Sequence, residues 1–142
     1  MTPSGPHSHH IFVFGSNLKG RHGKGAALHA VKHYSACEGV GYGPQGHAYA
    51  IPTKGYALET LPLSVIERHV GYFITCVNYR DNVRMGFRMA EYNVTQIGCG
   101  LAGYTAEQIA PMFKPIEQAL NVWFDKAWEH WLPQAKYWES PI

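Results

Sequence analysis

Two glycine-rich segments most constrain the fold that this chain can adopt, because each one follows a short apolar run and precedes a helical pattern. The first, GRHGKG at Gly20–Gly25, comes after the apolar run Ile11–Phe14 and the tripeptide Gly15–Asn17. The second, GCGLAG at Gly98–Gly103, follows an extended segment that ends at Ile97. Glycine lets backbone N–H groups approach an anion closely, and a helix start adds its positive dipole end. The two loops therefore predict a phosphate-binding site built from backbone amides.

The rest of the chain alternates strand and helix patterns. We expect strands at 11–14, 48–51, 89–97 and 122–124, and helices from residue 26, from 62 to about 79, and at 105–113. Pro52 should end the second strand and Pro62 should begin a helix, while Thr105 and Gln108 form a capping-box pattern. The Gly- and Pro-rich stretch 37–46 should be irregular, and the tryptophan-rich end a tail. The alternation predicts an α/β fold with a mostly parallel mixed sheet and helices on both faces.

Length and charge narrow the class of protein. A chain of 142 residues suits one domain, which we expect at 11–142 after a flexible tail at 1–10. The net charge is only +2 and no block of Lys or Arg occurs, which disfavours a dedicated nucleic-acid binder. No apolar run approaches the ~20 residues of a membrane helix, and the first charged residue is Lys19, unlike a signal peptide. We therefore expect a cytoplasmic protein with no membrane partner.

The loop sequences are similar to those of a known family. IGCGLAGY at Ile97–Tyr104 resembles the second phosphate loop of macrodomains, and FVFGSNLKGRHGKGAA at Phe12–Ala27 resembles the first. AIPTK at Ala50–Lys54 resembles the intervening strand in the branch of terminal ADP-ribose protein glycohydrolases. The resemblance runs from about Ile11 to Phe113. It implies a three-layer α/β/α macrodomain-like fold and, as ligand, ADP-ribose or a related nucleotide diphosphate.

The resemblance also implies roles for single residues. Asn17 would face the distal ribose, and Lys54 matches the lysine that attacks the ribose anomeric carbon in the glycohydrolase branch. That branch places an aspartate directly after its Ile-Gly-Cys-Gly-Leu, where this chain has Ala102. A lysine–aspartate pair therefore lacks its acid here. The residues implied along the ligand are Asn17, Gly23, Lys24, Gly25, Ala26, Gly98, Cys99, Gly100, Leu101, Gly103 and Tyr104.

Titratable residues provide candidate catalytic groups and argue against a metal site. His22 and Lys24 lie in the first loop, where a cation or a general acid would meet an anion unless they form an ordinary exposed pair. Together with Lys54 and Asn17, His22 is a candidate catalytic residue. His29 and His33 have a zinc-compatible spacing on a helix, but there is no acid between them and no obvious third ligand, so we expect no metal site and no cofactor.

Other histidines, cysteines and tryptophans have simpler interpretations. His7, His9 and His10 could chelate a metal adventitiously. Cys99 is expected to be a small packing residue, and three widely spaced cysteines predict no disulfide framework. Trp123, Trp128 and Trp131 are expected to cover the core or an oligomer contact.

Three functions fit the sequence. The first is hydrolysis of an ADP-ribose derivative, such as a protein ester, a nucleobase adduct or a 1″-phosphate, with an ADP-ribosylated protein or nucleic acid as substrate. The second is a non-catalytic reader or scavenger of ADP-ribose-type nucleotides, which the alanine at position 102 favours. The third is an interaction protein that has lost the ligand, against which the intact glycine loops count.

Overall fold

The computed structural model describes residues 9–78 and 90–142, and these residues contain one six-stranded sheet. The strands are β1 (Ile11–Asn17), β2 (Gly43–Gln45), β3 (Ala48–Lys54), β4 (Tyr92–Val94), β5 (Val122–Asp125) and β6 (Lys136–Trp138). Their order across the sheet is β2-β3-β1-β4-β5-β6. Only β2 is antiparallel to its neighbour, and the other four pairs are parallel. The predicted α/β fold with a mostly parallel mixed sheet is confirmed.

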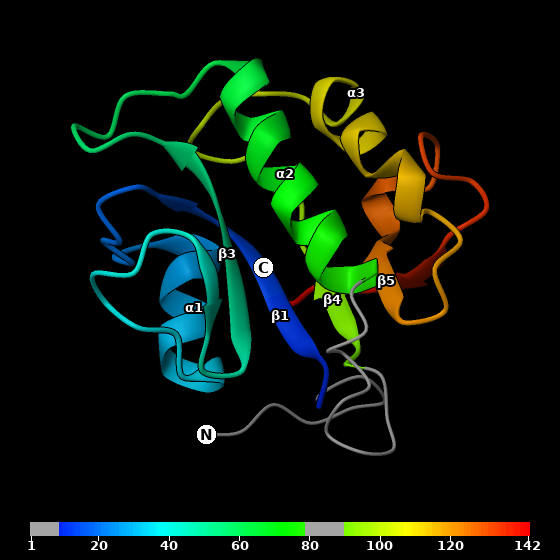
Figure 1. The fold of residues 1–142 in the computed structure, drawn as a ribbon, viewed down its shortest axis with the longest axis horizontal. Helices are drawn as coiled ribbons and strands as arrows, with labels where there is room; N and C mark the ends of the chain where they lie inside the picture. The colour runs from blue at the N-terminus through cyan, green and yellow to red at the C-terminus, as the bar shows by residue number, and fades with distance from the viewer. Residues whose placement is uncertain (1–8, 79–89) are drawn as a thin grey trace.

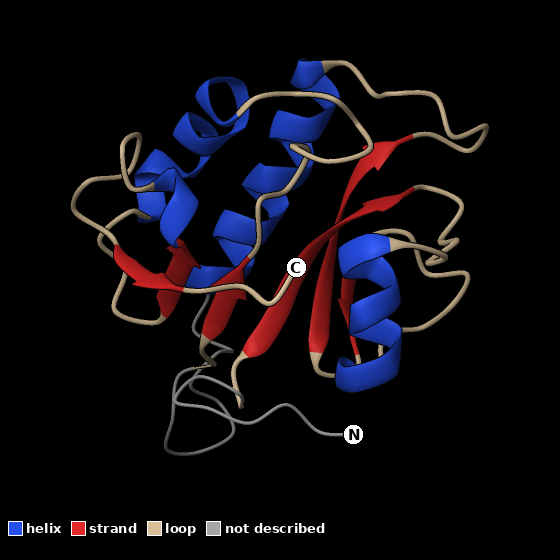
Figure 2. Ribbon diagram, turned by 180° about the vertical axis from the view of Figure 1, so that it is seen from behind, coloured by secondary structure: helices blue, strands red, loops and turns tan. Residues whose placement is uncertain are grey.

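Helices lie against both faces of this sheet. They are α1 (Gly25–Tyr34), α2 (Leu63–Asn78), and α3 (Ala106–Ile109), which continues into the 3₁₀ helix η2 (Ala110–Ile116); a further 3₁₀ turn, η3, spans Lys126–Trp128. Seen from behind, α1 stands in front of the strands and α2 behind them (Figures 1 and 2). The side chains of β1 alternate accordingly. Phe12 packs in one buried cluster with Ala30 of α1, and Val13 in another with Phe73 of α2.

Two strands run further than their sequence patterns indicate. β1 continues through Gly15 to Asn17, and β3 continues through Pro52 to Lys54. Pro52 lies opposite Ser16 of β1, while β2 ends opposite Ala50 on the other edge of β3. At Pro52 that edge has no partner strand, so the missing N–H of proline removes no ladder hydrogen bond there. The prediction that Pro52 ends the strand is therefore wrong.

The third α-helix is shorter than predicted, because prolines follow its first turn. The capping box of Thr105 and Gln108 is present, and it starts α3 as expected. The α-helical turn then tightens into η2 at Ala110, because Pro111 and Pro115 lack the N–H groups that a continuing α-helix needs. The other helices lie close to expectation: α1 begins one residue early, and α2 begins just after Pro62.

The tryptophan-rich end is a structural part of the fold, so the prediction of a tail is wrong. β6 adds the sixth strand, and the Trp138 indole N–H donates to the Val94 carbonyl oxygen at 2.9 Å. Trp128 is fully buried in the core, as the packing interpretation predicted. The stretch 37–46 contains β2, which was not expected. The predicted N-terminal tail lies outside the described residues up to residue 8, but His10 is buried.

A buried carboxylate ties η2 to the loop before β6. Glu117 accepts a hydrogen bond from the Gln134 N–H at 2.7 Å and pairs with Lys114 at 2.9 Å. The Gln134 hydrogen bond, followed by Lys114, lowers the pKa of Glu117 below its usual value although burial opposes this. A carboxylate whose pKa is lower in the folded chain stabilises the fold when it is ionised.

We therefore predict that Glu117→Gln lowers the free energy of unfolding by about 1 kcal/mol at pH 7. The wild-type advantage is complete above the unfolded pKa of about 4.3 and disappears as pH falls through the lower folded value. Urea unfolding of both proteins between pH 7 and pH 2.5 measures this difference. A difference that stays constant down to pH 2.5 contradicts the ionic role of Glu117.

Candidate functional site

The two glycine loops leave the same carboxyl edge of the sheet, because they follow β1 and β4, which are parallel neighbours. A Cβ atom built on Gly15 of β1 lies 3.6 Å from the backbone nitrogen of Gly98, at the start of the second loop. A Cβ atom built on Gly98 lies 3.7 Å from the Thr53 methyl group of β3. The ends of three strands thus converge where ligands of α/β proteins usually bind.

The first loop presents consecutive backbone donors. Within residues 9–78 and 90–142, the N–H groups of Gly23, Lys24, Gly25 and Ala26 have no hydrogen-bond acceptor. Lys24 is the N-cap of α1 and provides no side-chain cap, and the first turn of α1 contains no acid. Gly25 has φ +58, a left-handed backbone that favours glycine, and a Cβ on Gly23 or Gly25 would meet nothing within 4 Å. These amides are open to an anion.

The second loop is held more tightly and leaves a shorter run of donors. Its own carbonyl groups accept from the N–H groups of Gly103 at 3.0 Å and Tyr104 at 2.9 Å. In the described part of the chain, the N–H groups of Gly100, Leu101 and Ala102 have no acceptor. The following helix contributes little, because α3 has only four residues and its capping box already uses the N–H groups of Thr105 and Gln108. The second loop must therefore act through its own backbone.

Asn17 has a structural role within the first loop. Its amide nitrogen donates to the Arg21 carbonyl oxygen, and its amide oxygen accepts from the Arg21 N–H, both at 2.9 Å. This pair of hydrogen bonds closes the turn that leads from β1 into the glycine-rich segment. The side chain expected to face a ribose therefore fixes the shape of the loop in this structure.

His22 lies inside the protein rather than on the loop surface, which corrects the expectation of a loop cation. Its side chain is 1% exposed and its ring packs edge-on against Phe14. Its Nε2 lies 3.1 Å from the Val40 carbonyl oxygen and 3.2 Å from Gln45 Oε1, two acceptors, so Nε2 carries the hydrogen. Lys24 and Arg21 are exposed and are the loop cations that remain available.

Lys54 ends β3 beside both loops. It pairs with Asn17 in the β1–β3 register, and its carbonyl oxygen accepts from the Leu18 N–H at 2.8 Å. It also forms a β-bridge with Thr60, whose hydroxyl donates to the Ala102 carbonyl oxygen at 3.2 Å. The lysine and position 102 are thus joined through one intervening residue.

Two polar residues near the second loop were not recognised from the sequence. Asp125, at the end of β5, is buried; it accepts from the Ala127 N–H at 2.9 Å and from the Gln96 side chain at 3.4 Å. An acid directly after the apolar run of a strand is the signal that could have indicated it. Asp125 places negative charge near Cys99.

Cys99 is a partly buried thiol, in agreement with its interpretation as a packing residue. Burial in the first place, and the charge of Asp125 in addition, raise the pKa of Cys99, although Trp128 opposes them. Cys37 is exposed. Since the thiolate is the reactive form, the two cysteines should differ in reactivity.

We predict that Cys37 reacts with an aromatic disulfide reagent at pH 7.5 at least about tenfold faster than Cys99, because Cys37 is exposed whereas burial shields Cys99 and raises its pKa. Peptide mass spectrometry after timed quenching assigns each rate. Cys37→Ser should remove the fast phase and leave the slow phase of Cys99 unchanged. Equal labelling of the two residues contradicts the buried, protonated state of Cys99.

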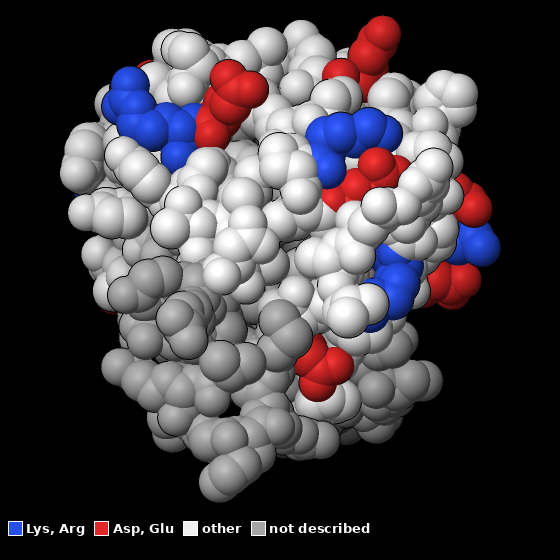
Figure 3. Space-filling model, turned by 45° about the vertical axis from the view of Figure 1, so that its right-hand side comes forward, with Lys and Arg blue, Asp and Glu red and all other residues white. Residues whose placement is uncertain are grey.

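On the face shown in Figure 3, the basic side chains of the described residues are scattered among acidic and uncharged ones. This distribution agrees with the low net charge of +2. None of the helices in residues 9–78 and 90–142 has the length and apolar character that crossing a bilayer requires.

Comparisons with known proteins add information on the fold. No protein-family model matches the chain, and no curated protein sequence matches it. A solved structure of a protein of unknown function from Bacteroides thetaiotaomicron is similar, with a TM-score of 0.55 and 17% sequence identity. The similarity covers 86% of this chain and 89% of that one. It supports the α/β architecture over most of the length.

Proposed function

We propose that this chain binds ADP-ribose or a related nucleotide diphosphate, with the diphosphate between the two glycine-rich loops. The observation that carries the proposal is the pair of solvent-facing amide runs at one sheet edge, Gly23–Ala26 and Gly100–Ala102. Each run suits the oxygens of one phosphate, because successive N–H groups in such loops form concave anion sites. Lys24 adds a positive charge beside the first run.

The arrangement favours a diphosphate over a single phosphate. Neighbouring strands of a sheet lie about 4.8 Å apart, and each of the two loops that follow adjacent strands would take one of two linked phosphate groups. The resemblance of both loop sequences to macrodomains supplies the identity of the nucleotide, which the amides alone do not define. The macrodomain-like assignment and the ligand are parts of the same proposal.

Glycines at the loops give the direct test. Gly23 and Gly100 have no left-handed backbone, and a Cβ on either meets nothing within 4 Å, so a branched side chain fits the folded chain but projects into the ligand space. We predict that Gly23→Val and Gly100→Val weaken ADP-ribose binding at least about tenfold, equivalent to about 1.4 kcal/mol. Titration calorimetry measures the affinity, and urea unfolding checks the fold.

Gly71→Val is the matched control, because its surroundings are equally open and it lies in the middle of α2 rather than in a loop. It should bind ADP-ribose like the wild-type protein. The wild-type protein should also bind ADP-ribose more tightly than AMP or ribose 5-phosphate. If the three ligands bind equally, or if both loop variants bind normally, the two-loop site is refuted.

A second candidate, hydrolysis of an ADP-ribose derivative, is favoured by the location of Lys54 at the same sheet edge. In this reaction the neutral Lys54 amine would form a bond to the ribose anomeric carbon while the bond from that carbon to the leaving oxygen breaks. Water would then release the ribose. Without this chemistry the protein is a reader or scavenger.

We predict that Lys54→Ala abolishes turnover of the derivative but leaves ADP-ribose affinity within about threefold, because no bond between Lys54 and the phosphates is needed. Borohydride should trap a ribosyl–lysine adduct on Lys54 in the wild-type protein alone, and mass spectrometry identifies it. Turnover at the wild-type rate in Lys54→Ala refutes the nucleophile.

If the wild-type protein binds ADP-ribose but turns over nothing, the reader function stands. Ala102→Asp is then informative, because Thr60 contacts both the Lys54 backbone and the Ala102 carbonyl oxygen. Activity gained in this variant shows that only the acid partner is lacking.

A further inference from the structure

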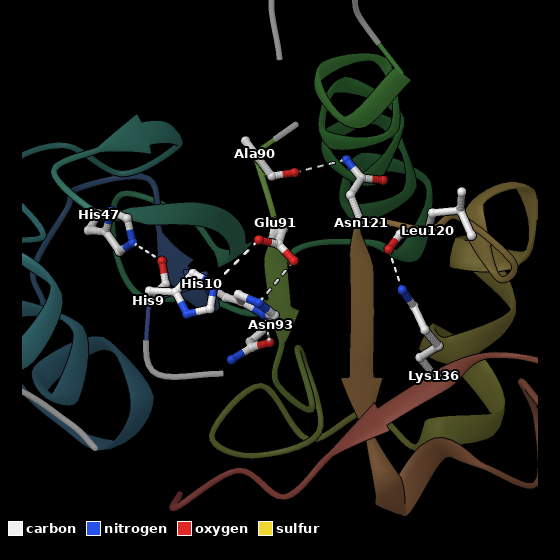
Figure 4. Close-up of polar contacts among 9 residues, drawn as sticks. All are labelled: His9, His10, His47, Ala90, Glu91, Asn93, Leu120, Asn121 and Lys136. Atoms are coloured by element: carbon white, nitrogen blue, oxygen red, sulfur yellow. Dashed lines mark hydrogen bonds and ion pairs between the residues drawn. The ribbon is translucent and has the colours of Figure 1, made fainter. Parts of the chain in front are cut away.

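The opposite edge of the sheet gathers two histidines and a glutamate from distant parts of the sequence (Figure 4). His9 and His10 directly precede β1, and Glu91 directly precedes β4. Because β1 and β4 pair in parallel, with Ile11 opposite Tyr92, their preceding residues become neighbours. The Ile11 N–H donates to the Glu91 carbonyl oxygen at 2.7 Å and fixes this approach.

The three side chains have the spacing of metal ligands. His9 Nε2 lies 3.3 Å from Glu91 Oε1, and His10 Nε2 lies 3.2 Å from Glu91 Oε2. The candidate ligand atoms all lie within 4.8 Å of one another. In a tetrahedral zinc site with bonds of about 2.0–2.1 Å, ligand atoms are about 3.3 Å apart. The two nitrogen–oxygen contacts therefore already have the length of an edge in such a site.

The orientation of the His10 ring also suits a metal ligand. Its Nδ1 lies 2.9 Å from Asn93 Oδ1, and as an acceptor this oxygen keeps the imidazole hydrogen on Nδ1. His10 Nε2 then faces the Glu91 carboxylate, where a proton or a bound cation balances the negative charge. An outer hydrogen bond of this kind is typical of metal-bound histidine. His10 is only 2% exposed, and its ring packs on Trp123 at a centroid distance of 4.4 Å.

We propose that His9, His10 and Glu91 bind one divalent cation with the ligand preferences of zinc, with water completing the coordination. Two imidazoles, one carboxylate and an open position form a donor set that zinc accepts. His9 is 57% exposed in its side chain, so the metal can enter from solvent. Lys136, the nearby cation, donates to the Leu120 carbonyl oxygen and covers the Trp123 ring at 3.7 Å. The bound cation would fasten the start of β1 to the start of β4.

Zinc and cobalt(II) are the probes for the test, because copper and nickel bind exposed histidines with little discrimination. Metal-free full-length protein should bind one Co²⁺, with visible absorption bands of low-symmetry four- or five-coordination that one equivalent of Zn²⁺ abolishes. Zn²⁺ at about 100 times its Kd should raise the unfolding midpoint by about 5–10 °C.

Glu91→Gln keeps the size of the side chain but removes its charge, and His10→Gln removes a buried ligand. Each should weaken Co²⁺ binding at least about 100-fold and abolish the Zn²⁺-dependent rise in midpoint. His33→Ala, which disrupts the other histidine pair, should behave like the wild-type protein. If Glu91→Gln retains wild-type Co²⁺ affinity, or if His33→Ala loses it, the proposed site is refuted. Metal binding requires no nucleotide, so this outcome is independent of ADP-ribose binding.

Discussion

The parallel pairing of β1 with β4 is the constraint on which both candidate sites depend. It aligns Ile11 with Tyr92 and Val13 with Val94, two segments far apart in the sequence. At the carboxyl edge, the same register starts the two glycine loops from neighbouring strands. At the amino edge it brings His10 against Glu91. A shift of one residue would turn the side chains of β1 to the wrong faces and separate both sets of residues.

Burial on both faces holds that register. Phe12 and Phe14 point toward α1, whereas Val13 points toward α2, and all three are fully buried. Burying each such side chain contributes about 1.5–3 kcal/mol, and a shifted register would forfeit most of it. The unpaired N–H groups of the first loop cost the fold little free energy. Water can hydrogen-bond to them in the free protein, so they remain available for an anion.

The sequence predicts what depends on local chemistry. The apolar run of β1, the capping box at Thr105 and the alternation of strands and helices all lead to the observed α/β sheet. Prediction from the sequence fails where a neighbouring strand determines the structure, as at Pro52. The missing N–H of Pro52 is tolerated because β2 pairs with β3 only as far as Ala50. Prediction also fails for His22, since only the fold reveals that the ring lies under the loop. The approach of Glu91 to His9 depends on strand pairing that no local pattern encodes.

The first loop combines open donors with a fixed shape, and the two properties have separate causes. Asn17 closes the turn through both of its amide atoms, and the backbone N–H of His22 is held at 2.8 Å by Glu38. Ordering a backbone residue costs about 1–2 kcal/mol, so a loop already held at both points loses less entropy when an anion binds. The same amides without these anchors would have to be ordered by the ligand itself. The side chains of Asn17 and Glu38 thus organise the backbone on which the proposed anion site depends, while glycine at positions 23 and 25 keeps that backbone accessible.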